Sequence, residues 1–128
     1  MPYDILIVDD SAVTRALIKR TITLTQLPIG ALYEANDGQS GLEVLAAHRV
    51  DLVLADLHMP KMGGVDMTTR IMANEQTRDT PVVIISAEPD VEQIDRLKHS
   101  GIKGYLRKPF TPEDLCHLLT ELLGVAHD

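Results

Sequence analysis

Cysteine and aromatic residues are scarce in this sequence of 128 residues. Cys116 is the only cysteine, tryptophan is absent, and three tyrosines and one phenylalanine supply all the aromatic rings. A single thiol excludes an internal disulfide and favours a reducing compartment. No apolar run approaches the ~20 residues that span a bilayer, and the first four residues lack the basic region of a signal peptide. We therefore expect a cytoplasmic protein without membrane contact.

Positive charge is also scarce. Lys and Arg number 12 against 19 Asp and Glu, which gives a net charge of −7, and no basic run offsets it locally. Such a surface repels phosphodiester backbones, so we expect no nucleic-acid partner. The 5 histidines show no zinc-site spacing with one another or with Cys116. A transition-metal site is therefore not expected.

The sequence does contain enough apolar material for a packed core. Hydrophobic residues make up 45% and charged residues 24%, which is close to average globular usage. A chain of this length buries roughly two thirds of the surface that its unfolded form exposes. Because no linker, repeat or low-complexity stretch interrupts the chain, we expect residues 1–128 to form a single domain, without room for an output domain.

Three short apolar runs indicate buried strands. They are Ile5-Leu6-Ile7-Val8, Leu52-Val53-Leu54-Ala55 and Val82-Val83-Ile84-Ile85. Unbroken runs rich in β-branched residues are typical of parallel strands covered on both faces. Residues 31–35 and 104–106 are weaker candidates and fit edge strands.

Helix-like segments alternate with these strands. The clearest has leucines at i, i+3, i+4, i+7 and i+8 and begins after Thr111, a candidate N-cap, and Pro112, which suits the first helical position. Five alternations predict an α/β fold, a doubly wound five-stranded parallel sheet with five helices and right-handed crossovers. The apolar residues expected on the buried sides of the other four helices are Val13, Ala16, Leu17 and Leu24; Leu42, Leu45 and Ala46; Met67 and Ile71; and Val91, Ile94 and Leu97.

Polar side chains follow the predicted strands. Asp9 and Asp10 follow the first strand, Asp56 the third, Ser86 the fourth and Lys108 the fifth. The carboxyl ends of parallel strands meet at one edge, where ligands bind, so we expect these side chains to converge. Three close carboxylates are tolerable only with a cation or with raised pKa values. Mg²⁺ fits because it takes oxygen ligands and keeps waters that a phosphate can displace.

Each of these residues also has an ordinary structural interpretation. Asp10 or Ser11 alone fits a helix N-cap, Asp56 a loop acid, Ser86 a turn hydroxyl and Lys108 a solvated surface charge. Independent ordinary roles would not be expected to place all of them directly after strands. The occurrence of all these residues directly after strands therefore favours a functional site.

The same residues carry a resemblance to a known family. Over essentially its whole length the sequence resembles response-regulator receiver domains, and it is similar to their single-domain, chemotaxis-type members. The resemblance implies the flavodoxin-like strand order 2-1-3-4-5, which agrees with the two weakest strands being edges. The motifs are Asp9-Asp10-Ser11, residues 56–64 (DLHMPKMGG), Ser86-Ala87 and Lys108-Pro109-Phe110.

The resemblance also implies roles for individual residues. Asp56 would be the phosphoacceptor, Asp10 would bind Mg²⁺ directly, and Asp9 would assist largely through water. The remaining implied roles are a metal bond from the backbone carbonyl of His58, phosphoryl contacts from Lys108 and Ser86, an inward swing of Tyr105, a cis Lys108-Pro109 bond, and tuning of phosphoryl lifetime by the side chains of His58 and Glu88.

The function expected from these roles is that of a phosphoacceptor response regulator in a two-component system or phosphorelay. A phosphohistidine on a sensor histidine kinase or histidine phosphotransfer protein would supply the phosphoryl group, and Mg²⁺ would assist. Apart from its own phosphorylation and dephosphorylation, we expect no enzymatic activity. The surface expected to contact a downstream target is the fourth helix, fifth strand and fifth helix near Tyr105, bearing Glu92, Gln93, Arg96 and Lys98.

Three alternatives remain open at this point. An aspartate-nucleophile phosphohydrolase uses a similar sheet, although such enzymes have a second aspartate where Ser11 stands here. A flavodoxin-like flavin carrier would call for a Gly/Ser/Thr-rich loop after the first strand, where Asp9 and Asp10 would repel the flavin phosphate. A receiver-like scaffold that is never phosphorylated is disfavoured by the complete acidic set and Lys108.

Overall fold

The computed structural model describes residues 2–87 and 91–123, and its centre is a five-stranded parallel sheet. The strand order is β2-β1-β3-β4-β5, and every adjacent pair is parallel. This confirms the predicted sheet, with the two weakest strands at its edges. The strands are β1 (Tyr3–Val8), β2 (Ile29–Ala35), β3 (Leu52–Ala55), β4 (Val82–Ser86) and β5 (Gly104–Arg107).

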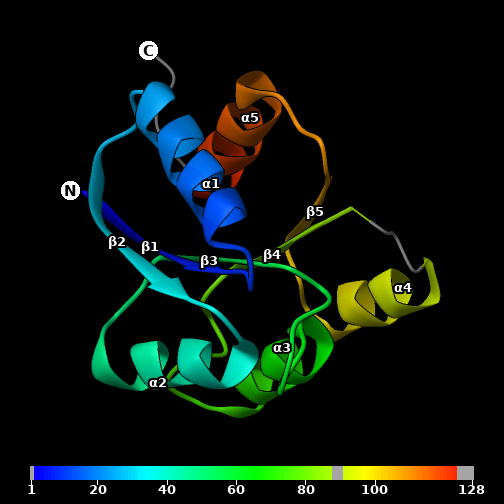
Figure 1. Cartoon of the computed structure of the whole chain (residues 1–128). Helices are drawn as coiled ribbons and strands as arrows, with labels where there is room; N and C mark the ends of the chain where they lie inside the picture. Colours follow the sequence, from blue (N-terminus) through cyan, green and yellow to red (C-terminus); the bar gives the residue numbers. More distant parts are fainter. Residues whose placement is uncertain (1, 88–90, 124–128) are drawn as a thin grey trace.

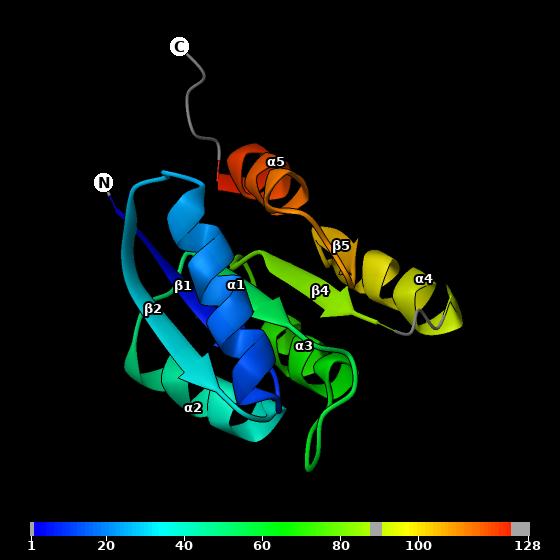
Figure 2. The same ribbon diagram turned by 45° about the horizontal axis from the view of Figure 1, so that its top comes forward.

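Five helices cover the sheet on both faces, as predicted. They are α1 (Ala12–Leu24), α2 (Gly38–Ala47), α3 (Gly64–Ala73), α4 (Val91–Ser100) and α5 (Pro112–Leu123). Figure 1 shows α1 and α5 on one side of the sheet and α2, α3 and α4 on the other. The turned view of Figure 2 shows α1 lying along β1 and β2.

The two cores follow from the alternation of side chains along each strand. On β1, Leu6 and Val8 face the α2, α3 and α4 layer, whereas Ile5 and Ile7 face the α1 and α5 layer. All four are at most 1% exposed. Over residues 5–8 neither face of β1 is left for polar side chains, so the chemistry-bearing residues of this end lie beyond its carboxyl terminus.

Side-chain caps fix where helices begin. The hydroxyl of Ser11 accepts the N–H of Thr14 at the start of α1. Thr111 and Asp114 exchange two hydrogen bonds of 3.1 Å at the start of α5, which confirms Thr111 as the cap. The predicted leucine stripe of α5 is also confirmed, with Leu115 and Leu119 fully buried.

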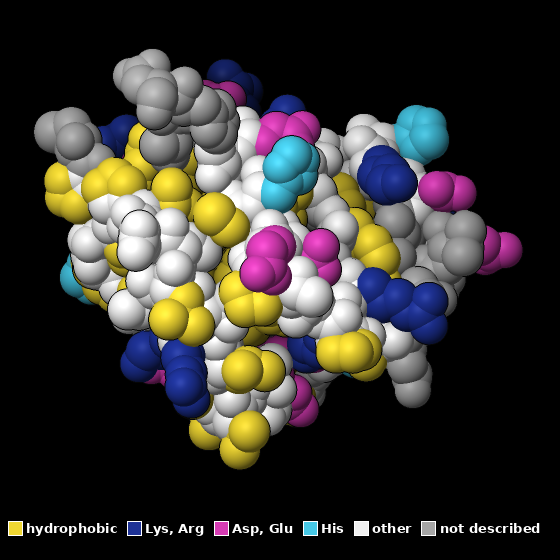
Figure 3. All heavy atoms as spheres, turned by 90° about the horizontal axis from the view of Figure 1, so that it is seen from above, with side chains coloured by type: hydrophobic (Ala, Val, Ile, Leu, Met, Phe, Trp, Pro, Cys, Tyr) yellow, Lys and Arg dark blue, Asp and Glu magenta, His cyan; other side chains and the backbone are white. Residues whose placement is uncertain are grey.

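The predicted buried side of α1 is wrong. Val13, Leu17 and Leu24 are 80%, 56% and 61% exposed, and Ala16 is exposed as well. The buried residues are Ile18, Thr21 and Ile22. The helix carries two apolar stripes, and only one can face the sheet. Figure 3 looks onto the side that carries α1 and α5 and shows hydrophobic side chains at its surface.

The other helices agree with the predicted faces except at one position. Met67 and Ile71 of α3 are fully buried, and Leu97 of α4 is 1% exposed. Ala46, expected on the buried side of α2, is exposed because it lies at the solvent side of the last turn. The side chains of Val91, Gln93 and Ile94 lie outside the described residues, as does Glu88.

No helix within residues 2–87 and 91–123 has both the length and the apolar character needed to cross a membrane.

Candidate functional site

The sheet register brings the ends of four strands into one row. Val8 of β1 pairs with Ala55 of β3, Ala55 pairs with Ile84 of β4, and Ser86 pairs with Arg107 of β5. The residues that follow these positions therefore leave the sheet side by side. The predicted site residues at this carboxyl edge are Asp9, Asp10, Asp56, His58, Ser86 and Lys108. Tyr105 lies within β5, and Glu88 lies outside the described residues.

Three carboxylates meet there. One carboxylate oxygen from each of Asp9, Asp10 and Asp56 lies within 4.8 Å of the other two. Asp9 is 2% exposed, Asp56 is half-buried and Asp10 is exposed. The cluster thus opens to solvent on the Asp10 side, where an ion or a phosphoryl donor can enter.

Lys108 bridges two of the carboxylates. Its Nζ donates to Oδ2 of Asp9 at 2.9 Å and to Oδ2 of Asp56 at 3.0 Å. Burial lowers the pKa of Lys108, but these two hydrogen bonds outweigh it, so its pKa lies above its ordinary value. Lys108 is therefore a fixed positive charge at the site near neutral pH.

Asp9 is held more tightly than its neighbour Asp10. Its Oδ1 accepts the N–H of Ser11 at 2.9 Å, and its own N–H donates to the carbonyl of Ala35 at 3.0 Å. Burial raises the pKa of Asp9, and the charge of Asp56 raises it further, while Lys108 and the Ser11 N–H lower it without reversing the shift. A cation bound here would relieve this accumulation of negative charge.

The loop after β3 is shaped by close backbone contacts. Oδ1 of Asp56 accepts the N–H of His58 at 3.2 Å, while the His58 side chain is exposed. A methyl group at Gly64 would overlap the carbonyl oxygen of Asp56. Only glycine allows the first turn of α3 to approach the backbone of Asp56 this closely.

Ser86 and Tyr105 occupy the other side of the site. Ser86 is 1% exposed, and its carbonyl accepts the N–H of Lys108 at 3.0 Å. The hydroxyl of Tyr105 donates to the same carbonyl over a long 3.5 Å. The Lys108-Pro109 peptide bond is cis, as the resemblance implies.

The donor set suits magnesium. The site offers carboxylate oxygens from three aspartates, and neither a thiolate nor an imidazole joins this cluster within the described part of the chain. Hard oxygen donors, two or three of them charged, match the preference of Mg²⁺, which keeps several waters of its own. The residues present therefore fit this ion.

Sequence reasoning missed Arg15, which contacts the site, and Glu34, which holds Arg15. Arg15 of α1 donates from Nη1 to the carbonyl of Asp9 and from Nε to Glu34 of β2. Nothing in the sequence marks Glu34 as a partner, because it lies 19 residues further along the chain in an edge strand. The packing of α1 on β2 brings the two together.

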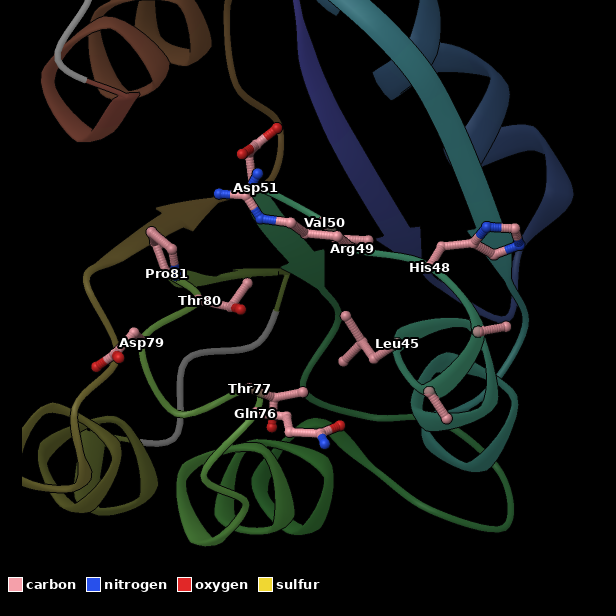
Figure 4. A pocket seen from close by; sticks show the side chains of 12 residues that line it. Leu45, His48, Arg49, Val50, Asp51, Gln76, Thr77, Asp79, Thr80 and Pro81 are labelled. Atoms are coloured by element: carbon pink, nitrogen blue, oxygen red, sulfur yellow. The ribbon is translucent and has the colours of Figure 1, made fainter.

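A separate hollow lies at the opposite edge of the sheet. It has a volume of about 440 Å³ and is formed by the end of α2 and the segment that leads into β4 (Figure 4). Its lining includes Arg49, Asp51, Gln76 and Asp79, so charges of both signs are mixed in it. It shares no residue with the acidic site.

A doubly wound α/β domain with three acids and a lysine at its carboxyl edge is the arrangement expected of a signalling phosphoacceptor. The chain matches the response regulator receiver domain over residues 5–120, and it belongs to this family. Receiver domains accept a phosphoryl group in two-component signalling and work with histidine kinases and downstream targets, and this chain has that role of phosphoacceptor.

Individual relatives agree with this assignment. Chemotaxis protein CheY-3 of Vibrio cholerae is 37% identical over 118 residues, which cover 92% of this chain and 89% of that protein. The structure of chemotaxis protein CheY4 of Vibrio cholerae superposes with a TM-score of 0.86 at 28% identity, covering 96% of this chain and 100% of the other.

A third structure has the same fold and contains a metal. The receiver domain of sensor histidine kinase PA1611 from Pseudomonas aeruginosa has a TM-score of 0.84 at 24% identity and covers 98% of this chain and 100% of its own. That domain holds a magnesium ion in its active-site cleft.

Proposed function

We propose that Asp56 accepts the phosphoryl group and that Mg²⁺ binds between Asp9, Asp10, Asp56 and the carbonyl of His58. The observation that carries this proposal is the meeting of three carboxylates within 4.8 Å of one another at one solvent-open edge, with Lys108 hydrogen-bonded to Asp9 and Asp56. The magnesium ion in the PA1611 receiver domain supports the choice of metal.

Asp56 is the carboxylate best placed to act as nucleophile. Asp9 is buried and bonded through both carboxylate oxygens, to Ser11 and to Lys108. Asp10 lies outermost and is free to bind an ion. Asp56 is half-buried, so its carboxylate reaches solvent as that of Asp9 does not, although its Oδ1 accepts the N–H of His58 and its Oδ2 accepts from Lys108. Attack by a carboxylate oxygen of Asp56 on a phosphohistidine would form an acyl phosphate and break the phosphorus–nitrogen bond of the donor.

Positive charge placed around the transferred phosphoryl group would supply most of the catalysis. Phosphoryl transfer needs an aligned nucleophile and positive charge on the equatorial oxygens, and bound Mg²⁺ would supply part of that charge. Lys108 supplies the rest, because its Nζ already lies beside Oδ2 of Asp56. On phosphorylation Lys108 would exchange its bond to Asp56 for one to a phosphoryl oxygen.

Ser86 and Tyr105 form the responding part of the site. The buried Ser86 hydroxyl lies on the strand next to Asp56 and would donate to a phosphoryl oxygen. Tyr105 is half-buried, and its hydroxyl is only loosely held by the Ser86 carbonyl. A new bond at Ser86 would therefore favour one position of Tyr105 over another and change the α4, β5 and α5 surface that a target protein contacts. Glu92, Arg96 and Lys98 are exposed on α4 there.

The donor protein has an apolar surface to contact beside the site. α1 begins two residues after Asp10, and Val13 and Leu17 in its first turns are strongly exposed. A protein that presents a phosphohistidine to Asp56 would cover them. The hydrophobic residues exposed on α1 thus support a docking surface for the histidine kinase or phosphotransfer protein.

The phosphohydrolase alternative receives no support from the acidic turn. The position two residues after Asp9 holds Ser11, and its hydroxyl caps α1 by accepting the N–H of Thr14 at 3.2 Å. A second aspartate acting as general acid is thus not found in this turn.

The test is phosphorylation by a small donor. The wild-type protein, Asp56→Asn and the matched surface variant Asp66→Asn are incubated with Mg²⁺ and acetyl phosphate and analysed by intact mass. We expect one added phosphoryl group on the wild type and on Asp66→Asn, and none on Asp56→Asn. Equal labelling of Asp56→Asn would refute Asp56 as the acceptor.

A further inference from the structure

Arg15 connects the acidic turn to the edge strand β2. Its Nη1 donates to the carbonyl oxygen of Asp9 at 2.5 Å, and its Nε donates to Oε1 of Glu34 at 3.1 Å. Lys19, one turn further along α1, donates to Oε2 of Glu34 at 3.0 Å. The side chain of Arg15 is 17% exposed, against 41% for Lys19. Of the two cations that hold Glu34, Arg15 also reaches the acidic turn.

The bond from Arg15 completes the immobilisation of Asp9. The N–H of Asp9 donates to Ala35, its Oδ1 accepts from Ser11, and its Oδ2 accepts from Lys108. The carbonyl oxygen is the remaining polar atom of this buried residue, and Arg15 is its donor. Because a peptide group is planar, holding this carbonyl fixes the plane that joins Asp9 to Asp10.

We propose that Arg15 is a positioning residue for the metal site, acting through the carbonyl of Asp9 while Glu34 anchors its guanidinium. A planar fork with several donors suits this task, because one side chain bonds a carboxylate and a carbonyl at a fixed angle. The inference rests on the proposed function, since it concerns how Asp9 and Asp10 are presented to Mg²⁺.

A purely electrostatic role and a positioning role predict opposite changes in Mg²⁺ affinity when Arg15 is removed. A nearby positive charge repels Mg²⁺, so removing Arg15 would tighten metal binding if charge alone mattered. If Arg15 orients the acidic turn, its removal would weaken metal binding instead. Outer residues that orient metal ligands typically contribute ten- to a hundredfold in affinity, and we expect about tenfold here because Arg15 acts through the backbone.

The experiment measures Mg²⁺ affinity by calorimetric titration of the full chain. Arg15→Ala is compared with Lys19→Ala, which removes the same charge and another bond to Glu34 but leaves the bond to Asp9. We expect about tenfold weaker Mg²⁺ binding in Arg15→Ala and unchanged or slightly tighter binding in Lys19→Ala. Arg15→Lys, which keeps the charge but has a single donor nitrogen, is expected to recover part of the affinity. Thermal unfolding establishes that each variant is folded.

A second readout uses the phosphorylation rate with acetyl phosphate as Mg²⁺ is varied. Positioning predicts that Arg15→Ala needs more Mg²⁺ for half-maximal rate but reaches nearly the wild-type rate at saturation. Faster hydrogen exchange of the Ser11 amide is expected in metal-free Arg15→Ala, because Asp9 no longer holds its orientation.

The possible failures are distinguishable. Equal or tighter Mg²⁺ binding by Arg15→Ala, relative to Lys19→Ala, would overturn the role of Arg15 and leave the proposed function intact. Absence of Mg²⁺ binding by the wild type would overturn the proposed function itself, and with it this inference.

Discussion

Replacing Asp10 by Asn should stabilise the metal-free protein, because it removes one of three mutually repelling charges. The remaining site consists of Asp9, Asp56 and Lys108, which together carry a net charge of minus one. Asp10 therefore meets an effective single negative charge at a distance of up to 4.8 Å.

The structure sets the size of this effect. At that distance two unit charges repel by about 0.9 kcal/mol in water and by about 3.5 kcal/mol at an effective dielectric constant of 20. Asp10 is exposed, so the lower value applies. We expect Asp10→Asn to raise the free energy of unfolding by about 1 kcal/mol, which corresponds to roughly 3–5 °C in Tm for a domain of this size.

Magnesium should reverse the order of stability. A ligand that binds only the folded protein stabilises it by RT ln(1 + L/Kd), where L is the free ligand concentration. The wild type gains this stability, whereas Asp10→Asn has lost a direct ligand and gains little. The assay is urea unfolding of both proteins, with chelator and with Mg²⁺, and Asp79→Asn at the opposite edge of the sheet serves as the matched control.

Two results would refute this reasoning. One is an Asp10→Asn variant that is less stable than the wild type in chelator, which would mean that Asp10 is not repelled by its neighbours. The other is an undiminished gain in stability with Mg²⁺, which would mean that the ion binds elsewhere.

Three further predictions concern other parts of the molecule. Leu17→Glu should slow phosphoryl transfer from a cognate phosphohistidine protein but not from acetyl phosphate, since Leu17 is exposed and lies outside the site; equal transfer rates from the protein donor would contradict docking on α1. Gly64→Ala should lower the free energy of unfolding by about 1–3 kcal/mol, because its methyl group overlaps the Asp56 carbonyl; unchanged urea midpoints would show that the loop yields freely. Asp37 caps α2, and the backbone N–H of Ser40 holds the pKa of its carboxylate below the ordinary value, so its charge contributes stability above about pH 4 that is lost as the pH falls further. Asp37→Asn should therefore be less stable than the wild type at pH 6, and the gap in urea midpoints should shrink by pH 3; a constant gap would show that the carboxylate charge contributes nothing.

The sheet was predictable because each buried strand is marked by an apolar run in its own short stretch of sequence. Parallel strands covered on both faces must be apolar throughout, so runs such as Leu52-Val53-Leu54-Ala55 stand out without any knowledge of their neighbours. The two edge strands were predictable for the converse reason. β2 and β5 are less fully buried, and their sequences mix apolar with polar or small residues. The acidic site followed from topology, because parallel strands deliver their following residues to one edge.

The exposed side of α1 could not be predicted in this way. Its sequence has apolar residues on two sides, and periodicity does not say which side packs on the sheet. The structure turns Ile18 and Ile22 inward, and Arg15 and Lys19 then face Glu34 of β2. That choice depends on contacts between segments far apart in the chain.

The sequence by itself determined the order of strands and helices, the identity of the acids and Lys108, and their arrival at one edge, because these depend on residue type and chain direction. Only the tertiary structure decided which carboxylate is buried, which is bridged by Lys108, and how Arg15 holds the carbonyl of Asp9. Burial and hydrogen-bond geometry are set when helices pack on the sheet, and no local pattern in the chain records them.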